Sequence, residues 1–165
     1  MRCPVRGNQE GGVRVSKNIL VVYKKNFEDV HDDALDIVKN TLEKIGEDLD
    51  INVNYSAREK VSREDFIERD LVVVLGGDGT LTSIAHSVDE NTPVMGVNSH
   101  PRDMDNDGSY GFYMGSDPIN FKEDIQKALS NNAIVNILPR LQAEISTTSG
   151  NIIRSDPALN DLLLA

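Results

Sequence analysis

The most constraining feature of this sequence is an uninterrupted apolar run, residues 71–75, that leads directly into a glycine-rich turn. Such a run is typical of a strand whose two faces are both covered, as in a parallel sheet flanked by helices. The turn reads GGDGT and consists of Gly76, Gly77, Asp78, Gly79 and Thr80. A helical pattern follows over residues 81–88. The order of strand, turn and helix predicts an α/β fold.

The rest of the first 130 residues predicts the same fold class. Short apolar or alternating runs indicate three further strands, at residues 18–23, 51–55 and 93–97. Apolar positions at helical spacing indicate helices at residues 29–49 and 117–129. Ser62 and Asp65 have the spacing of a capping box, which predicts a short helix between two of the strands. We therefore expect a Rossmann-like parallel sheet flanked by helices.

The pattern changes after Asn131, where consecutive strands replace the alternation of strands and helices. Three runs indicate these strands, at residues 134–137, 141–146 and 159–164. The chain ends on the apolar residues 162–165, which would form a strand without sheet partners. We expect a β-rich second domain that is truncated in this chain.

Charge and cysteine content limit the classes of function. The chain has 27 acidic and 17 basic residues, and this net charge of −10 argues against binding to nucleic acid or to an anionic membrane. The only cysteine, Cys3, allows neither a disulfide framework nor a cysteine zinc site. No apolar stretch approaches the roughly 18–20 residues of a membrane span. We expect a protein of a reducing compartment, cytoplasmic or in an organelle matrix, that binds small molecules.

The GGDGT turn has the features of a phosphate-handling site. Glycines let the backbone approach a ligand closely, and the start of the following helix presents free amide groups to an anion. An aspartate in such a turn repels phosphate, so we expect Asp78 to accept a proton from an attacking hydroxyl or to help hold Mg²⁺. The structural alternative is a tight strand-to-helix turn in which Asp78 only caps the helix.

The turn resembles the GGDGT signature of a kinase superfamily that includes NAD kinases, diacylglycerol and sphingosine kinases and, more remotely, 6-phosphofructokinases. Segments expected in the lipid kinases and phosphofructokinases are absent from this sequence. Further segments follow in the order typical of NAD kinases, namely Gly96-Val97-Asn98, Tyr110-Gly111-Phe112-Tyr113, Arg140-Leu141 and Ala158-Leu159-Asn160-Asp161. The chain therefore resembles the NAD kinase family.

This resemblance implies an enzyme that transfers the γ-phosphate of ATP to the 2′-hydroxyl of the adenosine ribose of NAD, which makes NADP. Asp78 would be the general base, and Mg²⁺ or another divalent cation would assist the transfer. The residues implied to line the ATP and NAD sites are Gly76, Gly77, Gly79, Thr80, Asn98, Phe112, Tyr113, Asn160 and Asp161. Phe112 and Tyr113 would form a wall of the dinucleotide pocket, and Asn160 and Asp161 would hydrogen-bond the ribose and adenine side of NAD.

Two other functions stay open at this point. The chain could be another GGDGT-type kinase that acts on a lipid, or a non-catalytic NAD(P)-binding module that has lost its closing domain. The resemblance also implies a β-sandwich second domain and a homo-oligomer when that domain is complete. We divide the chain into a flexible tail (1–17), an α/β nucleotide-binding domain (18–133) and the start of an incomplete β-sandwich (134–165).

The loop 99–110 is longer than in bacterial members of the family. It contains a D-x-D-x-D-G string, formed by Asp103, Asp105, Asp107 and Gly108, which copies the first half of a calcium-binding loop. Met114 stands where such a loop needs a glutamate, so calcium binding is the weaker interpretation. The favoured interpretation is an acidic, flexible lid over the substrate pocket.

Overall fold

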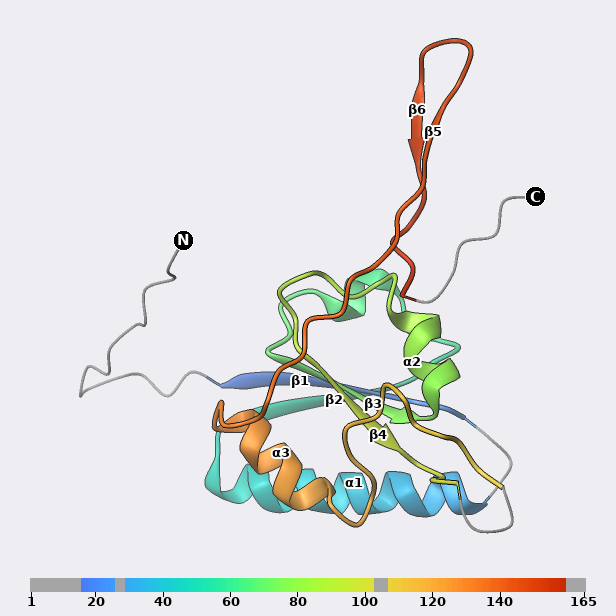
Figure 1. Cartoon of the computed structure of the whole chain (residues 1–165). Helices are drawn as coiled ribbons and strands as arrows, with labels where there is room; N and C mark the ends of the chain where they lie inside the picture. The colour runs from blue at the N-terminus through green and yellow to red at the C-terminus, as the bar shows by residue number, and fades with distance from the viewer. Residues whose placement is uncertain (1–15, 26–28, 103–106, 160–165) are drawn as a thin grey trace.

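The computed structural model describes residues 16–25, 29–102 and 107–159. Its main body is a four-stranded parallel sheet in the order β2-β1-β3-β4 (Figure 1). The strands are β1 (Lys17–Tyr23), β2 (Ile51–Ala57), β3 (Leu71–Gly76) and β4 (Val94–Asn98). Each of the four coincides with a predicted strand to within two residues, and the predicted α/β fold class is confirmed.

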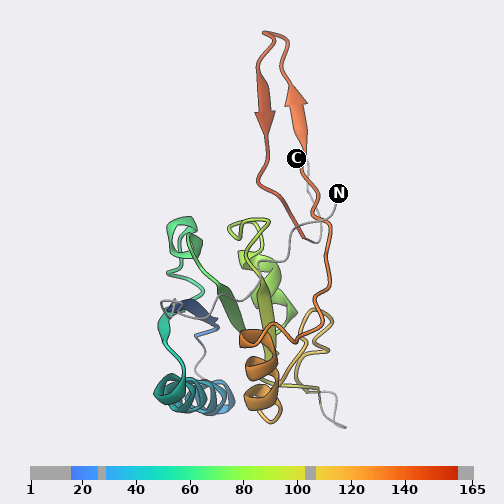
Figure 2. The same ribbon diagram turned by 90° about the vertical axis from the view of Figure 1, so that its left-hand side faces the viewer.

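Helices cover both faces of this sheet (Figures 1 and 2). On one face lie α1 (Asp29–Asp48) and α3 (Phe121–Leu129). On the other face lie α2 (Asp78–Ile84) and the 3-10 helix η1 (Arg63–Phe66). No helix among the described residues is long and apolar enough to cross a membrane.

The alternation of side chains along β3 explains its apolar sequence. Leu71, Val73 and Leu75 belong to the core cluster that includes α1 and α3, whereas Val72 and Val74 belong to the cluster that includes α2. All five side chains are at most 6% exposed. Burying one valine or leucine side chain stabilises a fold by about 1.5–3 kcal/mol. This strand therefore joins the two layers, and its carboxyl end is a rigid support for the GGDGT turn.

The GGDGT turn lies at the point where the strand order of the sheet reverses, between β1 and β3. β1 and β3 are neighbours, but α1 follows β1 on one face and α2 follows β3 on the opposite face (Figure 1). In open parallel sheets, ligands bind in the crevice outside the carboxyl ends of such a strand pair. The fold thus places the predicted phosphate-handling turn at the edge of the sheet where ligands bind.

The C-terminal part of the described chain forms a hairpin that projects away from the α/β body (Figures 1 and 2). It consists of β5 (Glu144–Ser146) and β6 (Ile152–Arg154), which pair in antiparallel fashion as a second, two-stranded sheet. The predicted strand 141–146 is thus shorter than expected, and β6 was not predicted. The segment 148–150 was interpreted as turn punctuation, and it connects the two paired strands.

Two other strand predictions in this region are not confirmed. Residues 134–137 have no regular secondary structure, and Ile134 and Ile137 are each 93% exposed. An apolar run becomes a strand only where a partner strand pairs with it, and no described strand pairs with this run. Of the predicted strand 159–164, only Leu159 is described, and it lies in a bend. The remaining residues of that strand lie outside the described residues.

Helix boundaries shift where polar side chains bind the backbone. α2 begins at Asp78, three residues before the predicted start, and ends at Ile84. α3, predicted to start at residue 117, begins only at Phe121. The Oδ1 atom of Asp117 accepts the backbone N–H groups of Ile119 and Asn120, which forms a turn before the helix. The predicted capping box is confirmed at η1.

Candidate functional site

The backbone of the GGDGT turn is held by hydrogen bonds, whereas its aspartate is partly exposed to solvent. Gly77 precedes α2 in an extended conformation, and its carbonyl accepts the backbone N–H of Thr80 at 2.9 Å. The Thr80 side chain is buried, whereas Gly79 is exposed and Asp78 is partly exposed. Asp78 is therefore the first residue of α2, and Gly77 occupies the cap position that the structural alternative assigned to the aspartate.

The Asp78 carboxylate is held by a segment distant in sequence. Its Oδ1 atom accepts the backbone N–H of Tyr113 at a distance of 2.8 Å. Among the described residues, no hydrogen bond to the second carboxylate oxygen, Oδ2, is formed. One oxygen thus fixes the direction of the carboxylate, and the other is available to a ligand. A carboxylate in this arrangement can accept a proton from a hydroxyl group placed beside it.

Asn98, at the end of β4, anchors the loop that crosses the turn. Its side chain is only 6% exposed. The Nδ2 atom donates to the carbonyl of Ser109 at 3.0 Å, and Oδ1 accepts the N–H of His100 at 3.3 Å. Ser109 lies against the turn, since a Cβ atom added at Gly77 would be 2.8 Å from the Ser109 Oγ atom. Glycine at position 77 permits this close approach, so the loop and the turn form one unit.

The predicted aromatic residues lie on the same loop. Phe112 is 83% exposed, whereas Tyr113 is partly buried and packs against the core cluster on the α2 face. Gly111, which lies between Tyr110 and Phe112, has a φ of +67°, a conformation that favours glycine. The backbone N–H of Tyr113 thus reaches the Asp78 carboxylate, and Phe112 precedes Tyr113 on the loop. Their role in a dinucleotide pocket stays a prediction.

The later motif segments also reach α2. Leu159 packs against the same core cluster as Tyr113. The Nη1 atom of Arg140 donates to the carbonyl oxygens of Ala85 and Val88, at 2.7 and 2.6 Å, just beyond the end of α2. Leu159 directly precedes the predicted ribose-binding residues in the sequence. Those two residues, Asn160 and Asp161, lie outside the described residues.

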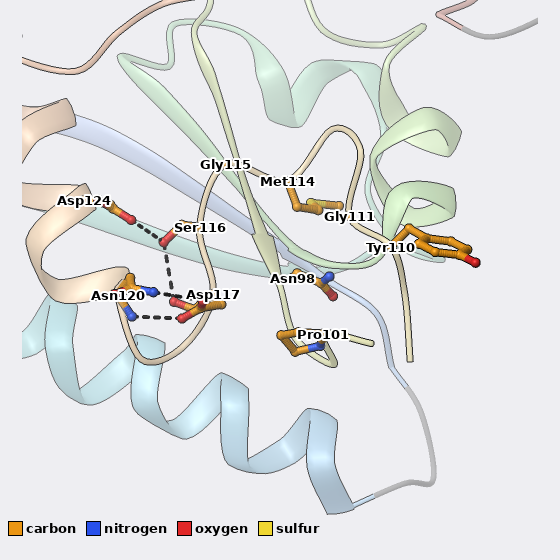
Figure 3. A pocket seen from close by; sticks show the side chains of 10 residues that line it. All are labelled: Asn98, Pro101, Tyr110, Gly111, Met114, Gly115, Ser116, Asp117, Asn120 and Asp124. Atoms are coloured by element: carbon orange, nitrogen blue, oxygen red, sulfur yellow. Dashed lines mark hydrogen bonds between the residues drawn. The ribbon is translucent and has the colours of Figure 1, made fainter. Parts of the chain in front are cut away.

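Two open hollows flank this region. The first, of about 200 Å³, lies between the loop and the start of α3, with Asn98 and Tyr110 on one side and Asp117 and Asn120 on the other (Figure 3). The second, of about 350 Å³, is lined by α2 and residues 156–159. Asp78 lines neither of these two hollows, and it is partly exposed.

The structure does not reveal a preformed metal cage. Among the described residues there is no group of three or more histidine, cysteine, aspartate or glutamate side chains that could hold a metal ion. Two members of the D-x-D-x-D-G string, Asp103 and Asp105, lie outside the described residues, and Asp107 is exposed. The calcium-binding and lid interpretations of this loop therefore stay predictions.

Sequence reasoning identified most residues at the turn but missed two contacts. Ser109, which touches Gly77, has no motif character, and only the path of the loop brings it there. Arg140 was recognised as part of a motif, but its bonds to the end of α2 were not predicted. The position of Arg140 within a motif, next to the apolar Leu141, was the signal from which a hydrogen-bonding role for its guanidinium group could have been predicted.

Comparisons with known proteins agree with this geometry. The sequence matches the family model of the ATP-NAD kinase N-terminal domain over residues 24–133. It is 34% identical over 96 residues to an NAD kinase from Pseudomonas fluorescens, covering 58% of this chain and 29% of that protein. An NADH kinase from Arabidopsis thaliana is 53% identical over 32 residues, which is 19% of this chain and 10% of the plant protein.

The fold is similar to that of a solved structure, the crystal structure of an NAD kinase from Archaeoglobus fulgidus in complex with ATP. The TM-score is 0.56 at 22% sequence identity, over 81% of this chain and 44% of the archaeal chain. This chain spans less than half the length of each of these relatives. Because the family match covers more than half of the sequence, and the fold agrees with that of a solved member, this chain belongs to the NAD kinase family.

Proposed function

We propose that this chain carries the catalytic turn of an NAD kinase, which transfers the γ-phosphate of ATP to the 2′-hydroxyl of the adenosine ribose of NAD. The observation that carries this proposal is the Asp78 carboxylate, fixed through Oδ1 by the Tyr113 N–H at 2.8 Å and open at Oδ2. It follows β3 at the ligand-binding edge of the sheet. Membership in the NAD kinase family favours this function over the lipid-kinase alternative.

In the proposed reaction, the Oδ2 atom of Asp78 accepts the proton of the ribose hydroxyl. The hydroxyl oxygen then forms a bond to the γ-phosphorus, the bond from that phosphorus to the bridging oxygen breaks, and ADP leaves. Phosphoryl transfer depends mainly on positioning and charge neutralisation. The Tyr113 N–H supplies positioning, because it holds the carboxylate in one direction.

We propose the following roles for the remaining site residues. Gly76, Gly77, Gly79 and Thr80 would line the phosphates. Of these, Gly79 is exposed and Gly77 is partly exposed, whereas Gly76 and Thr80 are buried. Asn98 would act through the loop that it anchors, since its side chain is buried. The wall of the dinucleotide pocket and the ribose contacts would come from Phe112, Tyr113, Asn160 and Asp161.

In the alternative role of Asp78, its carboxylate would help to hold Mg²⁺ or another divalent cation together with the nucleotide phosphates, in place of accepting the ribose proton. This fits the donor set, because Mg²⁺ sites of this kind use one or two carboxylates plus substrate phosphates and water. When bound, the cation neutralises charge on the phosphates. Asp78 is the only carboxylate within the GGDGT turn, and the α2 residues that follow it are neutral up to Ile84.

Assembly and location are part of the same proposal. The hairpin exposes Leu141, Ile145, Ile152 and Ile153, each at least 49%. Exposed apolar residues on a projecting hairpin favour contact with a further domain or with another copy, in agreement with the homo-oligomer that the resemblance implies. A cytoplasmic location fits the single cysteine and the use of ATP and NAD as substrates.

The test is the Asp78→Asn variant, which keeps the shape of the side chain but removes the base. NADP formation from ATP, Mg²⁺ and NAD should fall at least about 100-fold, in line with general-base catalysis. NAD affinity, measured by calorimetry, should change little. Asp36→Asn is the matched control, because Asp36 is an exposed carboxylate on α1 at the opposite face of the sheet. The assay is run on this chain and on the protein encoded by the full open reading frame that contains it.

Three outcomes would contradict the proposal. Unchanged turnover in Asp78→Asn would remove this carboxylate from the mechanism. Phosphorylation of diacylglycerol or sphingosine without NADP formation would identify a lipid kinase. NAD binding without turnover in either form of the wild-type protein would identify a non-catalytic module. Parallel assays with NADH and with polyphosphate define the acceptor and the donor.

A further inference from the structure

Basic residues gather at the carboxyl edge of the sheet, beside the GGDGT turn, although the chain as a whole is acidic. Lys24 and Lys25 directly follow β1, and the segment 58–63 directly follows β2. Together they hold five of the 17 basic residues of the chain and one acidic residue, Glu59, whereas the net charge of the whole chain is −10. Charges of one sign at one edge raise the local concentration of ions of the opposite sign, so this edge favours an anionic ligand.

Hydrogen bonds that continue the parallel ladder place Lys24 between Arg58 and the turn. Tyr23 is the last residue of β1 and lies opposite Leu75, the residue before the turn. The backbone N–H of Lys24 donates to the carbonyl of Leu75 at 3.1 Å, and the backbone N–H of Arg58 donates to the carbonyl of Tyr23 at 2.9 Å. Neighbouring strands are about 4.8 Å apart. Lys24 is therefore one strand spacing from the first glycine of the turn, and Arg58 is one spacing further.

Lys24 continues the face of β1 on which α2 packs. Leu20 and Val22 belong to the core cluster that includes α2, whereas Tyr23 packs against the cluster on the opposite face. Because side chains alternate between the two faces, Lys24 returns to the face on which Asp78 begins α2. The Lys24 side chain is partly exposed, and a lysine carries its ammonium group on a flexible four-carbon stem. This ammonium group can therefore reach a phosphate bound at the turn.

Arg58 and Lys25 extend the positive charge away from the turn. The Arg58 guanidinium pairs with the Glu59 carboxylate at 2.7 Å, and these side chains are 32% and 47% exposed. The pKa of Glu59 lies below its ordinary value of 4.5, mainly because its own backbone N–H donates to the carboxylate, and Arg58 and Lys25 lower it further. Lys25 is therefore close to this pair. An exposed ion pair contributes little to stability, so a phosphate group can replace Glu59 as the partner of Arg58.

The direction of phosphoryl transfer assigns this edge to the donor. In an in-line transfer, the attacking and leaving oxygens lie on opposite sides of the transferred phosphorus. The residues proposed above for the dinucleotide pocket include Tyr113, whose N–H reaches Asp78 from the loop that follows β4. β4 and β1 pair with opposite sides of β3. A hydroxyl that approaches Asp78 from the loop side thus leaves the remaining phosphates of the donor on the β1 side.

We propose that Lys24 and Arg58 form a subsite for those phosphate groups of the donor that are not transferred. Lys24 contacts the phosphate nearest the turn, and Arg58 contacts the next one. This inference rests on the proposed function and adds the residues that follow β1 and β2 to its site. The ligand chemistry is a chain of phosphate groups, which ATP and inorganic polyphosphate share, and the test separates these two sources.

The experiment measures binding to the whole chain by calorimetry, with inorganic tripolyphosphate, ATP and NAD as separate ligands. Lys24→Met removes the charge and keeps a side chain of similar length. It should weaken the binding of tripolyphosphate and of ATP by about tenfold, the lower end of the effect of a hydrogen bond to a charged group. Arg58→Gln should weaken both by about threefold, because Arg58 gives up its exposed pair with Glu59 on binding. The affinity for NAD should stay unchanged in both variants.

Two further variants control for folding and for total charge. Lys24→Arg keeps the positive charge and should keep most of the affinity for tripolyphosphate. Lys44→Met removes a charge from the exposed surface of α1, which packs on the opposite face of the sheet, and should leave this affinity unchanged. Lys24→Met should also reduce the dependence of tripolyphosphate affinity on salt concentration, because one fewer charge is screened. A purely structural role of Lys24 would not change this salt dependence.

Turnover distinguishes the two sources of the phosphate chain. NADP formation with ATP alone assigns the subsite to a nucleotide. NADP formation with inorganic polyphosphate assigns it to that polymer as well. In both cases Lys24→Met should raise the KM for the donor and leave the KM for NAD unchanged, which supports the subsite.

The subsite is overturned if Lys24→Met binds tripolyphosphate as tightly as the wild type, or if Lys44→Met weakens this binding equally. A wild-type chain that binds no tripolyphosphate overturns it as well. Equal losses of NAD and ATP affinity in Lys24→Met would place this residue at the acceptor and also overturn it. NADP formation with unaltered donor binding in Lys24→Met would remove the subsite and leave the proposed function intact. Tripolyphosphate binding that depends on Lys24, without NADP formation, would do the opposite.

Discussion

Arg140→Ala should detach the C-terminal hairpin from α2 without unfolding the α/β body. The Arg140 guanidinium donates to two carbonyl groups, those of Ala85 and Val88, at 2.7 and 2.6 Å. A hydrogen bond to a charged group contributes about 1.5–3 kcal/mol, and a cation at the end of a helix adds about 0.3–1 kcal/mol. The two bonds share one donor atom, so their effects do not add fully. We expect a loss of about 2–4 kcal/mol in the free energy that holds this junction.

A second arginine of the same region is the control. Arg154 pairs with Glu144 at 2.9 Å across the hairpin, and both side chains are largely exposed, at 65% and 49%. Exposed pairs of this kind contribute about 0–1 kcal/mol, so Arg154→Ala should have little effect. Arg140→Lys should recover only part of the loss, because an ammonium group is more strongly hydrated than a guanidinium group and costs more to desolvate beside these carbonyl groups.

The assay combines urea unfolding with amide hydrogen exchange. In Arg140→Ala, exchange should accelerate at the end of α2 and in residues 139–143, while the protection of β1 and β3 should stay unchanged. The backbone bonds between Leu141 and Ala158, both 2.8 Å, keep the base of the hairpin closed. If Arg140→Ala and Arg154→Ala have equal effects on exchange and on unfolding, the two carbonyl bonds do not hold the junction.

Two further predictions concern the stability of the fold. Gly111→Ala should destabilise the fold by about 1–3 kcal/mol in urea unfolding, because its positive φ and the nearby Asn98 side chain both oppose a Cβ atom, whereas Gly115→Ala, with open space around it, should stay within about 0.5 kcal/mol. The backbone N–H of Asn91 holds the pKa of Asp89 below its ordinary value of 3.8. The contribution of the ionised Asp89 carboxylate to the free energy of unfolding is therefore present above the unfolded pKa of about 4. It is lost as the pH falls through the lower pKa of the folded state. Asp89→Asn should lose less stability than the wild type between pH 5 and pH 3, and equal losses in urea titrations would contradict this.

The α/β body could be predicted from the sequence because each of its elements is specified locally. The run 71–75 is apolar at every position and is buried on both faces, and α1 repeats apolar residues at helical spacing over 20 residues. The hairpin region could not be predicted in the same way. Residues 134–137 are as apolar as β6, but only β6 has a partner strand at the right distance across a turn. Pairing is a tertiary property, and apolar runs alone do not determine it.

The candidate site shows the same division between local and non-local information. The sequence motif predicts a chemical role for Asp78, and the strand before it places the turn at the carboxyl end of the sheet. The bond from Tyr113 to Asp78 joins residues 35 positions apart. The contact of Ser109 with Gly77 depends on the course of the long loop. Neither contact has a spacing or composition that could be recognised before the loop was seen in place.

The short length of α2 explains why segments spread over 80 residues meet at this site. A helix of seven residues is too short to be stable by its own backbone bonds, so neighbouring segments must fix its direction. The Tyr113 N–H holds its first residue, Arg140 holds the carbonyls at its end, and Leu159 packs on the cluster beneath it. The orientation of the Asp78 carboxylate therefore depends on all three segments. A substitution that loosens any one of them should reduce turnover more than it reduces nucleotide affinity, because the carboxylate must be aligned only in the reaction step.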